Sequence, residues 1–166
     1  MSVKKILWVA ALLSVSPWVM AAAIGPEIGK PAPNFLGRTL DDMSYRLKSD
    51  VGQPKVINFF SLTCKPCRQE MPELAKLEKR NPGVKFIAVN TNDDKLEVVD
   101  KFIKALPGAP SHVVLTSGGL QETFRLMGLP HTIVLDSDNV VLLNLVGYTP
   151  ENIKLLQKTL QELAQH

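Results

Sequence analysis

Cysteine is scarce in this chain of 166 residues, and its only two cysteines, Cys64 and Cys67, lie three positions apart. A disulfide between them would close so small a loop that it would stabilise the folded state by only about 2 kcal/mol. The reactivity of the pair therefore explains it better than a structural role does. A lone Cys-x-x-Cys is also only half of a zinc site, and no second cysteine pair is present to complete one.

Charge of one sign is not in marked excess either. The 19 Lys and Arg residues and 16 Asp and Glu residues give a net charge of +3. The sequence has no basic stripe of the kind that nucleic-acid-binding proteins carry. It also has no internal repeat and no low-complexity segment, so its length and composition indicate one domain of ordinary size.

Long apolar runs are equally few, and the one at residues 6–20 follows a short basic start. It contains Pro17 and is shorter than the roughly 20 residues that a membrane-spanning helix needs. The alanines at 21–23 supply small residues for cleavage, so we predict a secretory signal that is cut after Ala21 or Ala23. An uncleaved membrane anchor is the alternative, whereas a lipid anchor on a cysteine is excluded because no cysteine directly follows the run.

The predicted organisation is a signal at residues 1–23 and a single domain at residues 24–166. Hydrophobic periodicity and turn residues predict alternating strands and helices along this domain. The expected strands are at 55–60, 84–90, 112–116, 131–135 and 140–146, and the expected helices are at 64–80, 96–106, 120–127 and 150–163. A short edge strand is also expected between Asp41 and Lys48. This order predicts an α/β fold, with a central mixed sheet covered by helices on both faces.

The two cysteines lie where a predicted buried strand runs into a predicted helix. This arrangement puts the sulfur of Cys64 over the helix N-terminus, where unpaired N–H groups and the helix dipole favour an anion. The thiolate is the reactive form of cysteine, and this position lowers its pKa. The sequence therefore predicts disulfide exchange, with Cys64 as the nucleophile and the more buried Cys67 as the resolving thiol.

Two polar side chains are candidates for helping the cysteines. Glu70 lies one turn beyond Cys67 and has two interpretations. It is either an anion that raises the pKa of a thiol and relays protons to Cys67, or a first-turn acid that complements the helix dipole. Asn58 lies on the strand beneath; its amide cannot act as a general base, but it can hold a water molecule or a backbone group.

Four short motifs, each weak on its own, occur together in this chain. They are Gly-Lys-Pro-Ala-Pro-Asn-Phe at 29–35, Asn-Phe-Phe at 58–60, Cys-Lys-Pro-Cys-Arg-Gln-Glu-Met-Pro at 64–72, and Gly-Leu-Pro-His-Thr-Ile-Val-Leu-Asp at 128–136. In this order and spacing they resemble the thioredoxin superfamily, and within it the exported TlpA/ResA-like thiol–disulfide oxidoreductases. The resemblance covers about residues 28–164. It implies a thioredoxin fold with an N-terminal extension and an extra strand–helix unit before Gly128.

The resemblance also implies a cis peptide bond before Pro130, which would lie beside the cysteines. Such a turn would leave the backbone of Leu129 free to pair with an extended substrate. A trans proline that opens the following strand is the alternative. Leu62 would add apolar contact with the substrate, and Thr63 would adjoin it, although Thr63 replaces the aromatic residue usually found before the first cysteine.

His131 is a second departure from the family, in which threonine often follows the proline. It is either a strand residue that faces the sheet or a third ligand near the two sulfurs. Two thiolates and an imidazole would suit copper(I) or zinc. A complete zinc site, however, needs four ligands, so we expect no metal.

The sequence thus predicts an exported, periplasmic and monomeric thiol–disulfide oxidoreductase that acts as a reductant through Cys64 and Cys67. The resemblance implies that its substrates are oxidised cysteines of other exported proteins, including apocytochromes c and copper-site proteins. The periplasm is kept oxidising, so a membrane thiol reductase is implied as electron donor. No nucleic acid and no separate cofactor is expected.

Alternative functions use the same residues. Phe-Phe-Ser at 59–61 is similar to the DsbA-like oxidases, which leaves an oxidase or isomerase open. A copper chaperone would use Cys64, Cys67 and His131. A peroxiredoxin is set aside because its Pro-x-x-x-Thr-x-x-Cys motif is absent around both cysteines.

Overall fold

The computed structural model describes residues 24–165, and the predicted signal at residues 1–23 lies outside the described residues. The strands are β1 (Leu36–Thr39), β2 (Ser44–Arg46), β3 (Lys55–Phe60), β4 (Lys85–Asn90), β5 (His112–Leu115), β6 (His131–Leu135) and β7 (Val141–Val146). The helices are α1 (Lys65–Arg80), α2 (Leu96–Lys104), α3 (Leu120–Thr123) and α4 (Pro150–Leu163), with a 3₁₀ turn at Leu47–Ser49. No helix within residues 24–165 is both long and apolar enough to cross a membrane.

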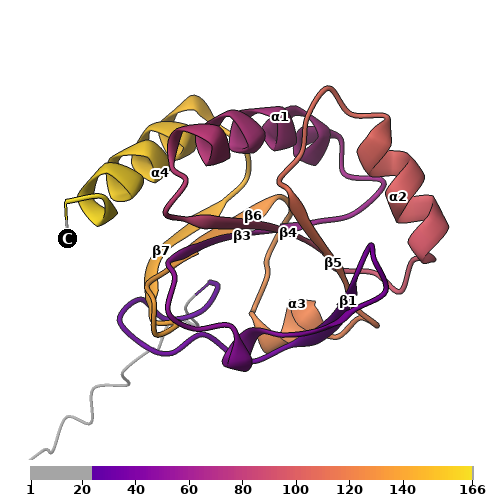
Figure 1. The fold of residues 1–166 in the computed structure, drawn as a ribbon, viewed down its shortest axis with the longest axis horizontal. Coiled ribbons are helices and arrows are strands. Elements are labelled where there is room, and N and C mark those ends of the chain that lie inside the picture. The colour runs from indigo at the N-terminus through magenta and orange to yellow at the C-terminus, as the bar shows by residue number, and fades with distance from the viewer. Residues whose placement is uncertain (1–23, 166) are drawn as a thin grey trace, which may run out of the picture.

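The strands form one mixed sheet in the order β2-β1-β5-β4-β3-β6-β7. β3, β4 and β5 run parallel to one another, whereas β1, β2, β6 and β7 pair antiparallel with their neighbours. Helices α1, α2 and α4 lie on one side of the sheet, and α3 lies on the other (Figure 1). The predicted α/β class, with helices on both faces of a mixed sheet, is confirmed.

β3 lies inside the sheet, between β4 and β6, and all six of its residues are buried. Ile57 and Phe59 face the α3 side and join the cluster that includes Phe124. Val56 and Phe60 face the opposite side, where they join the clusters under α1, α2 and α4. A strand buried on both faces fixes the position of its own end, and the cysteine loop begins there.

Helix α1 begins immediately after that loop, and Cys64 is its N-cap residue. The backbone N–H of Cys67 donates to Sγ of Cys64 at 3.2 Å, which satisfies one of the orphan donors of the first turn. Pro66 lies in that turn, where a missing N–H does no harm. Lys79 and Arg80 in the last turn complement the negative end of the dipole.

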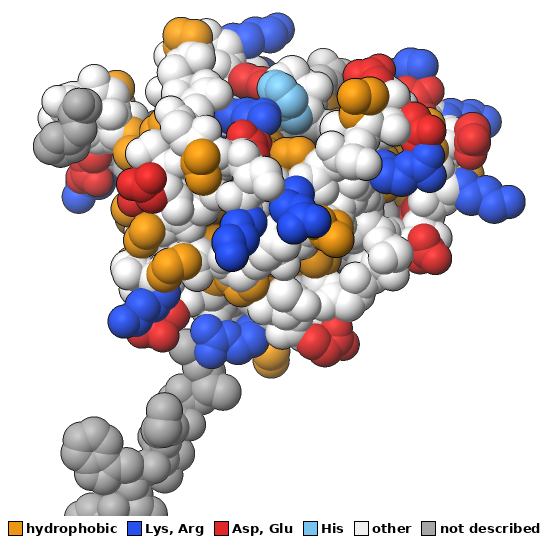
Figure 2. All heavy atoms as spheres, turned by 60° about the horizontal axis from the view of Figure 1, so that its bottom comes forward, with side chains coloured by type: hydrophobic (Ala, Val, Ile, Leu, Met, Phe, Trp, Pro, Cys, Tyr) orange, Lys and Arg blue, Asp and Glu red, His pale blue; other side chains and the backbone are white. Residues whose placement is uncertain are grey.

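The layer on the α3 side of the sheet is thinner than the helical layer, and segment 24–35 contributes to it. Phe35 packs with Phe124 and with the sheet residue Phe59 in one apolar cluster. Figure 2 brings this side forward and shows hydrophobic side chains in small groups among charged ones.

The structure departs from the predicted elements at two places, by one strand that was missed and one helix that was predicted too long. β1 was not expected because it is short, half-exposed and contains Gly37. That glycine lets β1 approach β5, since a Cβ there would lie 2.5 Å from the carbonyl oxygen of Leu115. The helix expected at 120–127 ends at Thr123, because Arg125 takes a left-handed conformation with φ 51°.

Candidate active site

The two cysteines form a disulfide at the N-terminus of α1, with their Cα atoms 5.3 Å apart. Cys64 is partly exposed, whereas Cys67 is fully buried under α2 and the sheet. The N–H that Cys67 donates to Sγ of Cys64 points at the position that a Cys64 thiolate would occupy after reduction. The geometry therefore offers one accessible sulfur that can be stabilised as an anion and one sulfur that is shielded.

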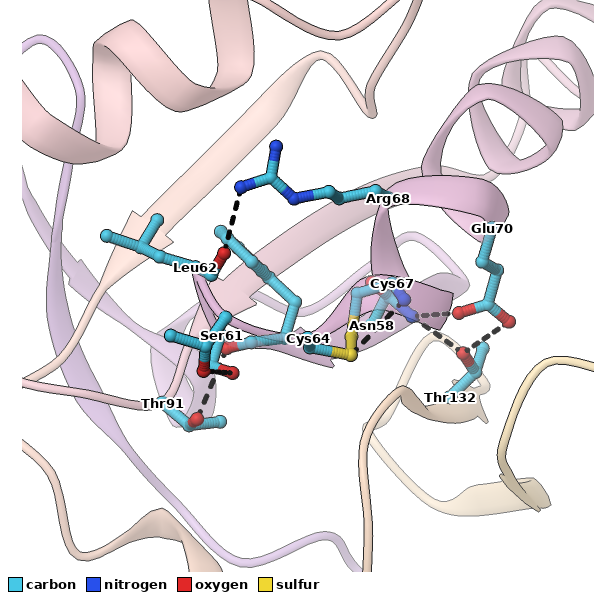
Figure 3. The surroundings of a disulfide bond; sticks show 11 residues. Asn58, Ser61, Leu62, Cys64, Cys67, Arg68, Glu70, Thr91 and Thr132 are labelled. Atoms are coloured by element: carbon cyan, nitrogen blue, oxygen red, sulfur yellow. Dashed lines mark hydrogen bonds between the residues drawn. A yellow bond between two sulfur atoms is a disulfide. The ribbon is translucent and has the colours of Figure 1, made fainter.

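Glu70 is buried beside this pair rather than exposed on the helix surface, with 2% of the residue accessible. The Asn58 amide donates to its Oε2 at 2.7 Å and to the hydroxyl of Thr132 at 2.9 Å. That hydroxyl in turn donates weakly to Oε1 of Glu70 at 3.4 Å. Figure 3 shows the carboxyl group turned from α1 towards Asn58 and Thr132. The interpretation of Glu70 as a first-turn acid that serves the helix dipole was wrong, because the side chain points into the interior.

Burial raises the pKa of Glu70 to about 7, although the hydrogen bonds from Asn58 and Thr132 act to lower it. The carboxyl group is thus present in both protonation states near neutral pH, which suits a group that accepts and returns a proton. The Asn58 amide nitrogen donates to both of these side chains, so it helps to hold the Glu70 carboxyl group in place.

We expect Glu70→Gln to change how stability depends on pH. In the folded protein Glu70 titrates at about 7, and in the unfolded chain it titrates near about 4.3. The folded state binds the extra proton between these values, so Glu70 lowers the free energy of unfolding as the pH rises through this window. Glu70→Gln lacks this loss. Its free energy of unfolding should therefore rise relative to that of the parent by about 3 kcal/mol as the pH goes from about 4 to about 8. Urea unfolding with the disulfide intact measures the difference.

Glu73→Gln is the matched control, because Glu73 lies on the same helix but pairs with Lys76 at the surface. It should show no comparable gain over the same range. Burial lowers the pKa of His131, which makes stability depend on pH in the opposite direction. The parent and both variants share this contribution, so it cancels when they are compared. A parent–variant difference that stays constant with pH would contradict the buried state of Glu70.

The peptide bond between Leu129 and Pro130 is cis, as the resemblance implied. Gly147 donates its N–H to the carbonyl oxygen of Pro130 at 2.8 Å, which ties this loop to the end of β7. Among the residues that the structure describes, no hydrogen bond engages the backbone N–H or C=O of Leu129. Leu129, Leu62 and Cys64 pack against the same buried cluster, so the structure brings these three predicted site residues together.

The loop before Cys64 is fixed by a residue that the sequence did not indicate. Arg68 donates to the carbonyl oxygen of Leu62 at 3.1 Å, and its guanidinium lies 4.5 Å from the ring centre of Phe102. Thr63 between Leu62 and Cys64 is exposed. Arg68 was missed because its aromatic partner comes from α2, and nothing in the local sequence shows that contact.

Thr132 was also missed, although strand alternation would have found it. Thr132 pairs directly with Asn58 across β6 and β3, so the two side chains share the α1 face of the sheet. His131, one position earlier, must then point to the opposite face. There it is fully buried, packs edge-on against Phe59 and bonds to Asn144.

The orientation of His131 decides between a strand residue that faces the sheet and a third ligand near the sulfurs. It is a strand residue packed on the side of the sheet away from α1, so it does not join the sulfurs as a third ligand. No group of three or more His, Cys, Asp or Glu side chains arranged to hold a metal occurs within residues 24–165.

Comparison with known proteins connects this geometry to a family. A family model described as Redoxin matches residues 27–160. The chain is 30% identical over 121 residues to the thioredoxin-like protein YneN of Bacillus subtilis, a match that covers 71% of each chain. It is also 30% identical over 124 residues to the thiol-disulfide oxidoreductase ResA of Bacillus anthracis, which covers 73% of this chain and 70% of that protein.

Solved structures give the same architecture. The crystal structure of a putative thiol:disulfide interchange protein DsbE from Chlorobium tepidum superposes with a TM-score of 0.74. That match covers 82% of this chain and 97% of the other at 24% identity, and it confirms the thioredoxin fold.

Proposed function

Because the chain belongs to the redoxin family, within the thioredoxin superfamily and of the TlpA/ResA-like type, we propose that it is a thiol–disulfide oxidoreductase that reduces disulfides in exported proteins. The observation that carries the proposal is the placement of the cysteine pair. Cys64 is partly exposed at the N-terminus of α1, and Cys67 is buried one turn away within disulfide-bonding distance.

The first half of the reaction begins with the reduced enzyme. The Cys64 thiolate attacks one sulfur of a substrate disulfide, and the other substrate sulfur leaves as a thiolate and takes a proton from solvent. The N–H of Cys67 and the dipole of α1 favour the thiolate before attack. The product is a mixed disulfide between Cys64 and the substrate.

The second half releases the substrate. The Glu70 carboxylate takes the proton of the Cys67 thiol, and the Cys67 thiolate attacks the Sγ of Cys64. The second substrate sulfur leaves as a thiolate, and the enzyme disulfide forms. Two electrons have then passed from the cysteine pair to the substrate. A pKa of about 7 lets Glu70 accept this proton and return it when the enzyme is reduced again.

Substrates would be extended, locally unfolded segments. The free backbone of Leu129 next to Pro130 suits β-pairing with such a segment, and Leu62 would add apolar contact beside the exposed Thr63. This selection fits cysteines of apocytochromes c or of copper-site proteins in the periplasm. A membrane thiol reductase would restore the reduced pair, and the protein would act as a monomer without a separate cofactor.

The proposal is tested by trapping. Cys67→Ala cannot complete the second half of the reaction, so mixed disulfides should accumulate on Cys64. Cys64→Ala should trap few, because the remaining sulfur is buried. The measurement is non-reducing electrophoresis of exported proteins bound to each variant, with identification of the partners. Equal trapping by both variants, or trapping by neither, would contradict the assigned roles.

A further inference from the structure

The segment at residues 24–31 crosses the side of the sheet away from the cysteines and is held there by backbone hydrogen bonds. We call this segment the strap. Gly25 donates to the carbonyl oxygen of Arg125 at 3.0 Å, and Gly29 donates to that of Val141 at 2.8 Å. Gly25 and Pro26 are buried, although the strap lies at the edge of the fold.

Asn144 on β7 connects the strap to the strand that follows Pro130. Its Nδ2 donates to the carbonyl oxygens of Ile24 at 2.7 Å and of Pro26 at 3.3 Å. Its Oδ1 lies 2.5 Å from Nε2 of His131. The two side chains meet because Asn144 pairs with Ile133, which puts it diagonally across from His131 on one face of the sheet.

The two carbonyl oxygens fix the direction of this hydrogen-bond chain. A carbonyl oxygen can only accept, so the amide must present Nδ2 to the strap and Oδ1 to the histidine. The His131 ring must then donate from Nε2. Burial lowers the pKa of His131 and so favours the neutral ring, in which Nδ1 is the bare nitrogen. Consistently, Nδ1 is buried and has no hydrogen-bond partner among the described residues.

Gly25 is required for this contact. Its φ is +74°, a conformation that other residues rarely adopt. A Cβ at this position would also lie 2.7 Å from Cγ of Asn144 and would overlap its amide group. The strap and Asn144 therefore fit together only while residue 25 is glycine.

We propose that Asn144, clamped by the strap, is a positioning residue that holds the ring of His131 and through it the Leu129–Pro130 backbone for pairing with an extended substrate. Pro130 is joined to the body of the protein on one side by Gly147 and on the other by the peptide bond to His131. Fixing the ring removes motion from that second attachment, so the loop loses less conformational freedom when a peptide binds. The inference rests on the proposed function, since it concerns the same substrate site.

The test compares an extended substrate with a small one in the full-length Cys67→Ser protein, which stops at the mixed disulfide. One substrate is an octapeptide whose single cysteine is joined to 2-nitro-5-thiobenzoate, and the other is 2-mercaptoethanol joined to the same leaving group. Release of the coloured thiolate gives the limiting rate and the half-saturating concentration. Asn144→Leu removes the amide, Gly25→Ala pushes the strap away, and Ile28→Ala changes an exposed strap residue as the control.

Asn144→Leu and Gly25→Ala should each raise the half-saturating peptide concentration about tenfold, while the limiting rate and the reaction with the small disulfide change by less than about twofold. Ile28→Ala should match its parent. An unchanged half-saturation, or an equal loss with both disulfides, would overturn the inference. A parent that reacts with neither disulfide would instead contradict the proposed function, and the inference would fall with it.

A spectroscopic measurement covers the case in which a variant does not fold. In ¹⁵N spectra of the parent at neutral pH, His131 should show a protonated Nε2 and a bare Nδ1. The opposite tautomer, or a charged ring, would show that Asn144 does not orient the histidine and would overturn the inference without any variant.

Discussion

Serine in place of Cys64 should lower the rate of disulfide reduction by at least about a thousandfold, because a serine hydroxyl is a far weaker nucleophile than a thiolate. Cys64 is the only sulfur of the pair with access to solvent, and Cys67 is fully buried. Cys67→Ser should instead keep the first half of the reaction and fail only in the second. Stopped-flow measurement of mixed-disulfide formation separates the two variants, and Lys65→Ala, an exposed neighbour, serves as the control.

The same asymmetry should appear in the pH dependence of alkylation of the reduced protein. Iodoacetamide should modify Cys64 first, with a midpoint within the range of about 3.5 to 7.5 known for thiols at helix N-termini and in Cys-x-x-Cys motifs. The N–H of Cys67 supplies part of that stabilisation. A midpoint close to about 8.5, the value for free cysteine, would contradict Cys64 as an activated nucleophile.

Much of this site could be predicted because its signals are local. The buried run at β3 followed by Cys64 fixes a strand–helix junction, and such a junction leads directly to a thiolate at a helix N-terminus. The ordered motifs also anticipated the cis bond before Pro130 and the position of Leu129 against the cluster that contains Cys67. Strand–helix alternation likewise predicted the layers, because each element repeats its own hydrophobic period.

What could not be predicted depends on contacts between distant segments. Whether Glu70 served the cysteines or the helix dipole was left open, because one acid near a helix start fits both. Its burial is decided by Asn58 and by Thr132, which lies 62 positions further along the chain. His131 was similarly open, and the choice was made by Asn144 and Phe59 on the far face of the sheet.

The reduction potential of the Cys64–Cys67 pair should lie near the roughly −270 mV of thioredoxin and far from the roughly −120 mV of DsbA. An oxidising pair requires a reduced form with a strongly stabilised thiolate. Here the Glu70 carboxyl group is buried one helical turn beyond the resolving thiol, and its negative charge disfavours a thiolate there. The nearby cation Arg68 is directed at Phe102 and Leu62, and Lys65 is exposed. The surroundings therefore favour the disulfide.

Equilibration with glutathione at pH of about 7 gives this potential, and Glu70→Gln tests its cause. Removing the carboxylate should stabilise the reduced pair relative to the disulfide. The reduction potential should therefore rise by about 30 mV, which corresponds to a tenfold change in the equilibrium constant. Glu73→Gln, at the surface of the same helix, should leave the potential unchanged. Since about 150 mV separates the two reference proteins, the parent value distinguishes a reductant from an oxidase by about five powers of ten. A potential near the DsbA end would assign the same cysteines to disulfide formation and overturn the proposed direction of electron flow.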